Sequence, residues 1–149
     1  MEVRRLEVSD AELACETVRA LKLTDEDQRR RLKTDDLRHF LSRPENYLIV
    51  AVEKGRPVGF LTAYLLNRID RHQPMMLLYE IGVGETSRRQ GIGTALINQL
   101  KSFCIDHQVM KMWVYTNKSN PAAMALYQRT GGEADQSGDE VSFLYQFTA

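Results

Sequence analysis

Cysteine is scarce in this sequence, and neither positive nor negative charge is in excess. Cys15 and Cys104 lie far apart and form no CxxC pair. Both fall in segments with an apolar pattern, so we expect reduced thiols in the core, with a disulfide between them as the open alternative. The 20 basic and 20 acidic side chains give a formal net charge of zero. This balance argues against a general nucleic-acid-binding protein, which normally shows a basic excess.

Long apolar runs are absent as well. No stretch approaches the roughly 18 residues that a membrane-spanning helix needs. The first ten residues, MEVRRLEVSD, are charged throughout and lack the apolar centre of a signal peptide. The three histidines, His39, His72 and His107, are scattered and form no set of metal ligands. We therefore expect a cytoplasmic protein that needs no metal and has no membrane partner.

The composition that remains is typical of one globular domain. Hydrophobic residues make up 43% of the 149 positions and charged residues 27%. These fractions are ordinary for a folded protein and differ from those of a disordered one. The sequence has no internal repeat and no linker rich in proline and glycine. The prediction is a single domain that covers residues 1–149.

The spacing of apolar residues predicts an α/β protein. Residues 75–83 and 110–116 are interpreted as central strands, and the first is apolar enough to be buried on both faces. The predicted elements are a strand at 2–8, a helix at 10–23, one or two exposed helices in 22–43, a hairpin at 46–66, a strand at 75–83, a helix ending near 107, a strand at 110–116, a helix at 121–130 and a hairpin at 133–147.

The stretch SRRQGIGTA, residues 87–95, follows a predicted strand and opens a helix. The start of a helix offers unpaired N–H groups and the positive end of its dipole, so it binds anions readily. Gly91 and Gly93 would let a phosphate approach the backbone, and Arg88 and Arg89 would add charge-assisted hydrogen bonds. The stretch matches neither a Walker P-loop nor a dinucleotide fingerprint. A strand-to-helix turn with glycines for packing and arginines for solubility is the open alternative.

Two motifs resemble those of the GNAT (Gcn5-related) N-acetyltransferase superfamily. RRQGIG after LLYEIGV is similar to its acetyl-CoA signature, and NPAAMALY before Gly131 is similar to its pattern after the fifth strand. The resemblance spans nearly the whole chain and implies the GNAT fold: a central mixed, mostly antiparallel sheet with splayed fourth and fifth strands, flanked by about four helices. In pattern the two segments are most similar to aminoglycoside 3-N-acetyltransferases of this fold.

The resemblance implies acetyl-CoA as the co-substrate and assigns its binding residues. In the family, the backbone of the fourth strand aligns the pantetheine arm, and amides at the start of the next helix hold the pyrophosphate. For Asn120, contact with the coenzyme arm and capping of the next helix both stay open, because Asn before Pro121 is favourable capping chemistry. The residues expected to bind the coenzyme are Ile81, Gly82, Val83, Arg88, Arg89, Gly91, Ile92, Gly93, Thr94 and Asn120.

Glu80 and Tyr127 are expected to carry the chemistry of transfer to an amine. Such a transfer needs a base for the amine, a donor for the developing oxyanion and an acid for the departing thiolate. Glu80, a carboxylate in an apolar strand, is the candidate base, acting directly, through a water or mainly by attracting the ammonium. An ion pair with a lysine or arginine is its alternative. The resemblance assigns the acid to Tyr127, whose phenol is protonated at pH 7; a core aromatic is its alternative.

The backbone N–H of Ile81 or Val83 is the expected oxyanion donor. Because neither cysteine is placed like an activated nucleophile, we expect direct transfer in a ternary complex.

The distribution of acidic residues favours a cationic acceptor. The chain after residue 131 carries acids and no lysine or arginine, and further acids lie at 25–36. Besides Glu80, the residues expected to bind the acceptor are Asp135, Asp139 and Glu140. Lys118 argues in the other direction, since aminoglycoside-acetylating relatives tend to be acidic there. Gly132 replaces a phenylalanine that is usual in relatives and leaves the shape of the acceptor pocket open.

The predicted function is transfer of an acetyl group from acetyl-CoA to a primary amine of a small cationic acceptor. An aminoglycoside antibiotic, and hence antibiotic resistance, is the leading interpretation. A polyamine, another small amine or a peptide or protein amine are alternatives within the same chemistry. A non-catalytic acyl-CoA-binding domain is the alternative of a different class. No nucleic-acid partner is expected, and the resemblance leaves a homodimer open.

Overall fold

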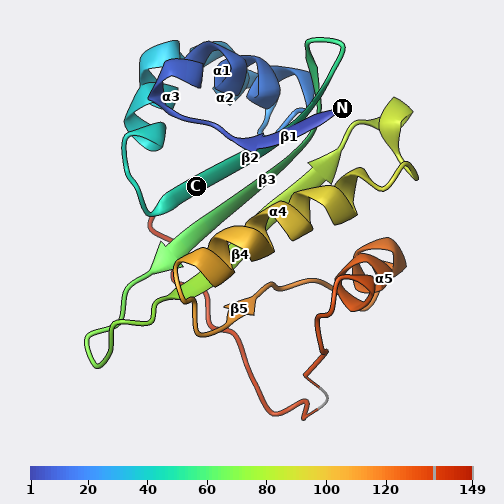
Figure 1. Cartoon of the computed structure of the whole chain (residues 1–149). Coiled ribbons are helices and arrows are strands. Elements are labelled where there is room, and N and C mark those ends of the chain that lie inside the picture. The colour runs from blue at the N-terminus through green and yellow to red at the C-terminus, as the bar shows by residue number, and fades with distance from the viewer. Residues whose placement is uncertain (136, 149) are drawn as a thin grey trace.

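One five-stranded sheet organises the chain, and its strands lie in the order of the sequence (Figure 1). The computed structural model of the chain describes residues 1–135 and 137–148. The strands are β1 Glu2–Arg5, β2 Asn46–Glu53, β3 Arg56–Leu66, β4 Met75–Val83 and β5 Met112–Trp113. The strands from β1 to β4 pair antiparallel, and β5 lies parallel to β4. The predicted mixed, mostly antiparallel sheet is therefore confirmed.

Five α-helices accompany the sheet in the described part of the chain. They are α1 Ala11–Ala20, α2 Glu26–Arg31, α3 Thr34–Leu41, α4 Ile92–Asp106 and α5 Pro121–Arg129. Short 3-10 turns at Val8–Asp10 and Glu85–Ser87 precede α1 and α4. The charged segment 22–43 forms two helices, as predicted. Because β4 and β5 are parallel, the chain must cross over between them, and α4 makes this connection.

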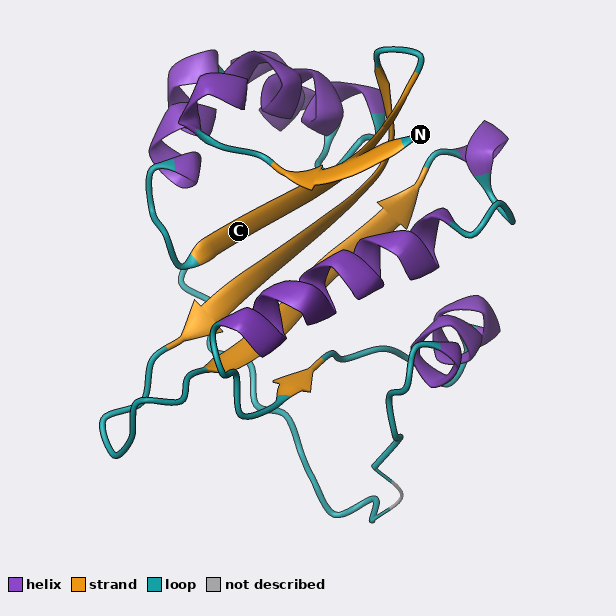
Figure 2. Cartoon of the chain, in the orientation of Figure 1, coloured by secondary structure: helices purple, strands orange, loops and turns teal. Residues whose placement is uncertain are grey.

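Helices cover both faces of the sheet (Figure 2). On one face α4 buries Leu96 and Leu100 against the sheet residues Ile49 and Leu61. On the other face α1 and α3 pack against alternate residues of β2 and β3, which are Leu48, Val50 and Phe60. Ile49 and Val50 are both fully buried because successive strand residues point to opposite faces. No helix in the described residues is both long enough and apolar enough to cross a membrane.

A β-bulge in β4 changes which of its residues face α4. Thr62 of β3 lies opposite Glu80, and the next pair in the register skips Tyr79, which therefore has no partner in β3. The β4 residues packed in the α4-side core are even-numbered before the bulge and odd-numbered after it: Met76, Leu78, Ile81 and Val83. Tyr79 and Glu80, although adjacent in sequence, consequently both lie on the face that carries α1 and α3.

The apolar sequence of β4 predicts that the strand is buried on both faces, and this prediction is wrong. Met76 and Leu78 are buried under α4, but Tyr79 on the opposite face is 61% exposed. The helices α1 and α3 pack mainly on β3 and β2, so they leave this part of β4 uncovered. A long apolar strand can thus be central in the sheet and still present one side to solvent.

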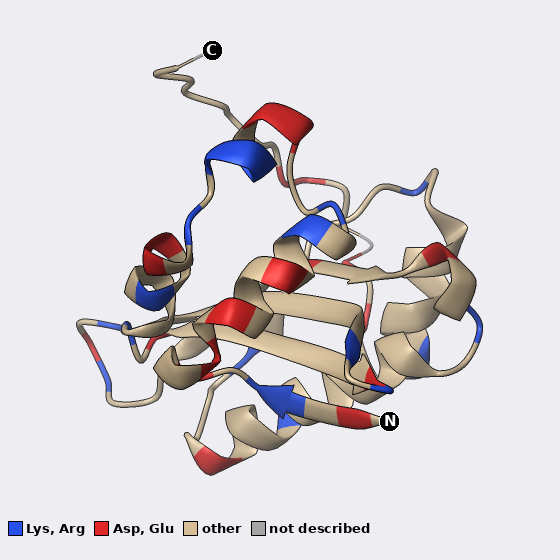
Figure 3. Cartoon of the chain, turned by 90° about the horizontal axis from the view of Figure 1, so that it is seen from above, with Lys and Arg blue, Asp and Glu red and all other residues tan. Residues whose placement is uncertain are grey.

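The last part of the chain also differs from the prediction. β5 has two residues and is the last strand of the sheet, and the described residues after α5 contain no strand in place of the hairpin expected at 133–147. Within this segment Gly138 has a left-handed backbone, with φ +65°. A two-stranded hairpin alone is marginally stable, and the end of this segment projects from the body at the C-terminus (Figure 3). Its apolar side chains are 77–92% exposed: Val141, Phe143, Leu144, Tyr145 and Phe147.

A two-pronged ion pair ties β1 to the start of α1. The Arg4 guanidinium donates to both carboxylate oxygens of Asp10, at 2.9 and 3.0 Å. Asp10 also accepts from the backbone N–H of Glu7 at 2.8 Å. The hydrogen bond from Arg4 lowers the pKa of Asp10 below its ordinary value of 3.8. These contacts set the angle at which the chain leaves the sheet edge and enters α1.

Replacement of this carboxylate, Asp10→Asn, is expected to lower the free energy of unfolding by about 1–2 kcal/mol at pH 7. The lowered pKa means that Asp10 stabilises the fold above the ordinary carboxyl pKa and loses this contribution as pH falls through its folded value. Urea unfolding at pH 7 and pH 3 measures this, and the gap between wild type and variant should shrink at pH 3. Asp27→Asn, in an exposed pair with Arg31, is the control. A gap that is equal at both pH values contradicts the prediction.

Candidate active site at the open edge of the sheet

The sheet opens along one side of β4. β5 pairs with β4 at only two positions, Met76 with Met112 and Leu77 with Trp113. β4 continues to Val83, whereas the chain after β5 bends away toward α5 (Figure 2). In the described part of the chain, residues 78–83 therefore have no strand on this side. The splay of the fourth and fifth strands, implied by the family resemblance, has this origin.

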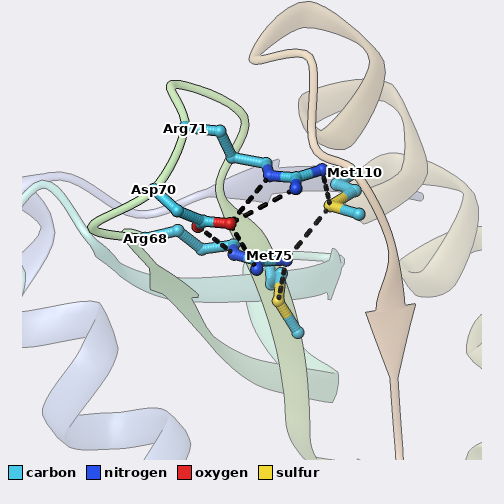
Figure 4. A network of polar contacts seen from close by, with 5 residues as sticks. All are labelled: Arg68, Asp70, Arg71, Met75 and Met110. Carbon is cyan, nitrogen blue, oxygen red and sulfur yellow. Dashed lines mark hydrogen bonds and ion pairs between the residues drawn. The ribbon is translucent and has the colours of Figure 1, made fainter.

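A polar network fixes the point from which the two strands diverge (Figure 4). Arg68 and Arg71 in the loop before β4 both bind the carboxylate of Asp70. Arg68 also approaches the sulfur of Met110 at 3.4 Å, and the Met110 N–H donates to Pro74 O at 2.9 Å. These contacts hold the start of β5 beside the start of β4, so the strands are joined at one end and free at the other.

Backbone amides of β4 face this gap. The N–H of Gly84 donates to Val58 O of β3 at 2.9 Å. Because N–H groups alternate from one side of a strand to the other, those of Ile81 and Val83 point away from β3 and into the open edge. Gly82 lies between them for a different reason, since a Cβ there would come within 2.6 Å of the Phe60 ring. The amides of the expected donors Ile81 and Val83 thus have no strand partner in the described residues, and Gly82 serves packing.

Glu80 lies half-buried beside the gap, on the face that carries α1 and α3. Its carboxylate accepts a hydrogen bond from the Thr62 hydroxyl at 3.2 Å. Among the described residues no lysine or arginine lies within 4.0 Å of this carboxylate, so the alternative of a structural ion pair is not realised. A carboxylate at a strand edge without a basic partner can accept a proton or meet an ammonium group.

Tyr127 approaches the sheet from the other face. It lies on α5 and packs, half-buried, against the core under α4, in which Ile81 and Val83 also take part. Burial raises the pKa of the Tyr127 phenol above 10, so the hydroxyl is protonated at neutral pH. Glu80 and Tyr127 therefore lie on opposite faces of the sheet, with Glu80 on the face of α1 and α3 and Tyr127 in the core under α4.

The start of α4 is open to an anion. Gly91 is its N-cap residue, with φ +76° and no side chain to cap the free N–H groups. A Cβ at Gly91 would meet no described atom within 4 Å, so the backbone at the helix start is accessible on that side. Arg88 and Arg89 are exposed just before it. Ile92 is buried and offers only its backbone N–H to a ligand.

The alternative explanation by packing applies to the second glycine of the motif. A Cβ at Gly93 would lie 3.1 Å from Leu126 of α5, so Gly93 allows α5 to approach α4. Thr94 accepts a hydrogen bond from the guanidinium of Arg129 at 3.3 Å. Arg129 therefore stands as a third guanidinium at this helix start, which sequence reasoning missed because 35 residues separate it from Thr94.

Asn120 caps α5. Its side-chain oxygen accepts from the Ala123 N–H at 3.1 Å, and Pro121 occupies the first helical turn. The sequence left two roles open for Asn120, capping of the helix and contact with the coenzyme, and the structure shows the capping. The side-chain amide nitrogen is left for other contacts.

The acidic residues expected to bind the acceptor are not gathered around Glu80. Asp135 accepts from the N–H of Ser137 at 2.9 Å within its own turn. Asp139 and Glu140 lie in the exposed terminal segment. The acids at 25–36 mostly serve their own helices: Asp25 caps α2, and others form pairs one turn apart. In the described residues, Glu80 has no acidic side chain among its hydrogen-bonded or ion-paired neighbours.

The open edge of β4 and the uncapped start of α4 lie next to each other in the chain. Together they could hold an extended ligand with an anionic group, with the ligand along the strand edge and the anion at the helix start. The chain belongs to the Acetyltransferase (GNAT) family, whose family model matches residues 10–132. The superfamily that its motifs resemble is thus confirmed.

Individual relatives share the fold or part of the sequence. The L-2,4-diaminobutyric acid acetyltransferase of Halalkalibacterium halodurans is 33% identical over 85 residues, which are 57% of this chain and 43% of that protein. The chain therefore matches less than half the length of this relative. An aminoglycoside acetyltransferase from an uncultured soil metagenomic sample, in complex with sisomicin, superposes with a TM-score of 0.83 at 23% identity, over 99% of this chain and 96% of that one.

Aminoglycoside N-acetyltransferase AAC(6′)-Iy in complex with CoA superposes with a TM-score of 0.75 at 18% identity, over 99% and 95% of the two chains. At these identities the likeness to the solved structures shows the fold alone.

Proposed function

We propose that this chain is an acetyl-CoA-dependent N-acetyltransferase that acetylates a primary amine of a small cationic acceptor, with 3-N-acetylation of an aminoglycoside as the leading case. The observation that carries the proposal is Glu80, a half-buried carboxylate that lies beside an open strand edge and has no basic partner among the described residues. Membership of the GNAT family supports the acetyl donor. The fold shared with aminoglycoside acetyltransferases supports the acceptor class.

Each side chain of the proposed site has one task. Glu80 accepts the proton of the incoming ammonium, because only the neutral amine has a lone pair for attack on a carbonyl carbon. The backbone N–H of Ile81 or Val83 donates to the carbonyl oxygen as negative charge develops there. Tyr127 donates its proton to the sulfur that departs. The C–N bond forms first, and the C–S bond breaks as the oxyanion collapses. The nitrogen loses two protons in all: Glu80 takes the first before attack, and the second, lost after attack, replaces the proton that Tyr127 gives to the sulfur.

Direct transfer to the amine is supported by the state of the two thiols. Cys15 lies on the buried face of α1 and is 4% exposed. Burial raises the pKa of Cys104 to about 11, so its thiolate is rare at neutral pH. Neither is an activated nucleophile that could carry the acetyl group on the protein.

The residues present fit the phosphates of acetyl-CoA. The free N–H groups at the start of α4, with Arg88 and Arg89 before it, would hold the pyrophosphate. The open edge of β4 would align the pantetheine arm through backbone hydrogen bonds, and the bound thioester would supply the acetyl group. Arg129, which contacts Thr94, adds positive charge at the same place.

Arg129→Ala is expected to raise the dissociation constant of CoA about five- to tenfold, because it removes one charge-assisted contact from a phosphate at a partly exposed site. Isothermal titration calorimetry with CoA measures this at two salt concentrations, and the loss should shrink at high salt. Arg31→Ala on the exposed helix α2 is the matched control. Equal CoA affinity in the wild type and Arg129→Ala contradicts the assignment.

The acceptor is the less constrained part of the proposal. The proposed acceptor-binding residues still include Asp135, Asp139 and Glu140. They can contact the acceptor when the terminal segment lies near Glu80. A different small amine, such as a diamino acid or polyamine, is a second candidate, favoured by the sequence match to an L-2,4-diaminobutyric acid acetyltransferase. A non-catalytic acyl-CoA-binding domain would use the helix start and strand edge but have no use for Glu80.

Release of free CoA, followed by a thiol assay, tests the proposed function. The acceptor panel contains gentamicin, tobramycin, spermidine, L-2,4-diaminobutyrate and a lysine peptide, each with acetyl-CoA. Turnover confined to the aminoglycosides is the expected result. Turnover confined to another amine would retain the acetyltransferase and overturn the aminoglycoside. Tight CoA binding without turnover on any acceptor would favour the non-catalytic domain.

We also propose that the protein is a homodimer joined through the terminal segment 141–147. Its apolar side chains are too exposed for a stable monomer surface, and the outer edge of β5 in the described chain is free to pair. Light scattering after size exclusion should give twice the mass of one chain, and the double variant Phe143→Asp with Phe147→Asp should give a single chain. Ile69→Asp, on an exposed loop, is the control. A monomeric wild type contradicts the proposal.

A further inference from the structure

Three aromatic rings form a row that ends beside Glu80. Phe40 of α3 meets Tyr64 of β3 edge-to-face, with ring centroids 6.2 Å apart and an interplanar angle of 83°. Tyr64 meets Tyr79 of β4 in the same way, at 5.7 Å and 71°. Edge-to-face pairs hold each ring in a defined orientation. Phe40 and Tyr64 therefore support Tyr79, although Tyr79 is 61% exposed.

The bulge in β4 places this row next to the carboxylate. With regular alternation, Tyr79 and Glu80 would point to opposite faces of the sheet. Because Tyr79 is skipped in the register with β3, both side chains lie on the face of α1 and α3. Thr62 and Tyr64, two residues apart on β3, lie on this face as well. A carboxylate and a large exposed aromatic ring thus stand side by side at the open edge.

This pairing suits a ligand that carries more than one ammonium group. The amine that reacts must lose its charge at Glu80, so Glu80 cannot also bind a permanent cation during transfer. An aromatic face attracts an ammonium without removing its proton. Burial, with smaller contributions from Glu80 and Tyr79, raises the pKa of the Tyr64 phenol above 10. Tyr64 therefore stays neutral and can give a hydrogen bond to the same ligand.

We propose that Tyr79, supported by Tyr64 and Phe40, is a specificity-determining platform that binds a second, unreacting ammonium group of the acceptor while Glu80 deprotonates the first. The proposal rests on the acetyltransferase function of this site and narrows its acceptor to compounds with at least two amines. Tyr79 holds the spectator cation, and Tyr64 positions the Tyr79 ring and donates to the acceptor frame. A monoamine leaves the platform empty and binds correspondingly less well.

The test compares acceptors and variants in steady-state kinetics. Tobramycin and 1,4-diaminobutane are the polyamine acceptors, meaning here acceptors with at least two amines, and butylamine is the counterpart with one amine. Tyr79→Leu keeps an apolar side chain but removes the ring, and Tyr79→Phe, which keeps the ring, is the matched control. Tyr79→Leu is expected to raise the KM of the polyamine acceptors about tenfold, with kcat and the KM of acetyl-CoA within twofold of wild type. Tyr79→Phe should retain the wild-type KM of the polyamine acceptors.

Two results would overturn the platform while the acetyltransferase stands. One is an unchanged KM in Tyr79→Leu, and the other is a butylamine KM equal to that of 1,4-diaminobutane in the wild type. If the wild type transfers no acetyl group at all, calorimetry with tobramycin decides the platform independently. Binding to the wild type that weakens about tenfold in Tyr79→Leu supports it, and absent or unchanged binding overturns it. Equal melting temperatures of all variants confirm that each one folds.

Discussion

Glu80→Gln is expected to lower kcat/KM for the amine by about 10²–10³-fold, with little change in the affinity for acetyl-CoA. The amide keeps the size of the side chain and can still accept the hydrogen bond from Thr62, but it cannot take a proton. The effect is large because an ammonium ion has no lone pair, so transfer depends on the small fraction of amine that is neutral in solution. The measurement is steady-state CoA release with the best acceptor of the panel.

The effects of this variant on kcat and on KM separate the roles left open for Glu80. If Glu80 is the base, Glu80→Gln lowers kcat and leaves the KM of the amine nearly unchanged. If Glu80 only attracts the ammonium, KM rises while kcat is retained, which contradicts the role as base. Glu53→Gln, at the end of β2 and away from the gap, is the matched control and should behave as wild type. A fully active Glu80→Gln enzyme would remove Glu80 from the chemistry.

Tyr127→Phe is expected to lower kcat about 10²-fold, because it removes the proton donor for the departing thiolate and keeps the ring that packs against the core. The KM of acetyl-CoA should change little. Burial raises the pKa of the Tyr127 phenol above its ordinary value of 10, so in the wild type the loss of rate that follows ionisation of the donor should occur at higher pH than for a free phenol. Rates measured between pH 6 and pH 10 test whether the alkaline loss of rate is displaced to higher pH.

An exposed tyrosine provides the control for this substitution. Tyr115 is 71% exposed in the chain after β5, and Tyr115→Phe should leave kcat unchanged. The melting temperature of Tyr127→Phe should stay within a few degrees of wild type, since the hydroxyl donates no hydrogen bond in the described residues. A full-rate Tyr127→Phe variant would return Tyr127 to its alternative role as a core aromatic.

The sequence alone was sufficient for the elements whose signals are local. Asn120 and Pro121 mark the start of α5 because the cap and the first turn involve atoms only three residues apart. Gly91 marks the start of α4 because the left-handed conformation there suits glycine. The motifs built on these signals identified the family, and Glu80 stood out as a carboxylate inside an otherwise apolar strand.

The tertiary structure alone decided where strands pair and which residues share a face. Apolar residues occupy every position from 75 to 78, so the sequence does not show the change of phase that puts Tyr79 beside Glu80. The same holds for β5, which ends after two residues, and for the segment 141–147, which has the alternation of a strand but no partner in the described chain. Arg129 beside Thr94 depends on how α5 packs over Gly93.

The physical reason for this division is the range of the interactions. Caps and turns depend on a few bonded neighbours, so a short sequence pattern determines them. Register, bulges and strand ends depend on the difference in free energy between alternative pairings of distant segments, and several pairings bury similar apolar area. The sequence of this protein therefore determined its family and the residue types of its chemistry. Only the packed sheet decided that the carboxylate, the open strand edge and the aromatic row meet at one place.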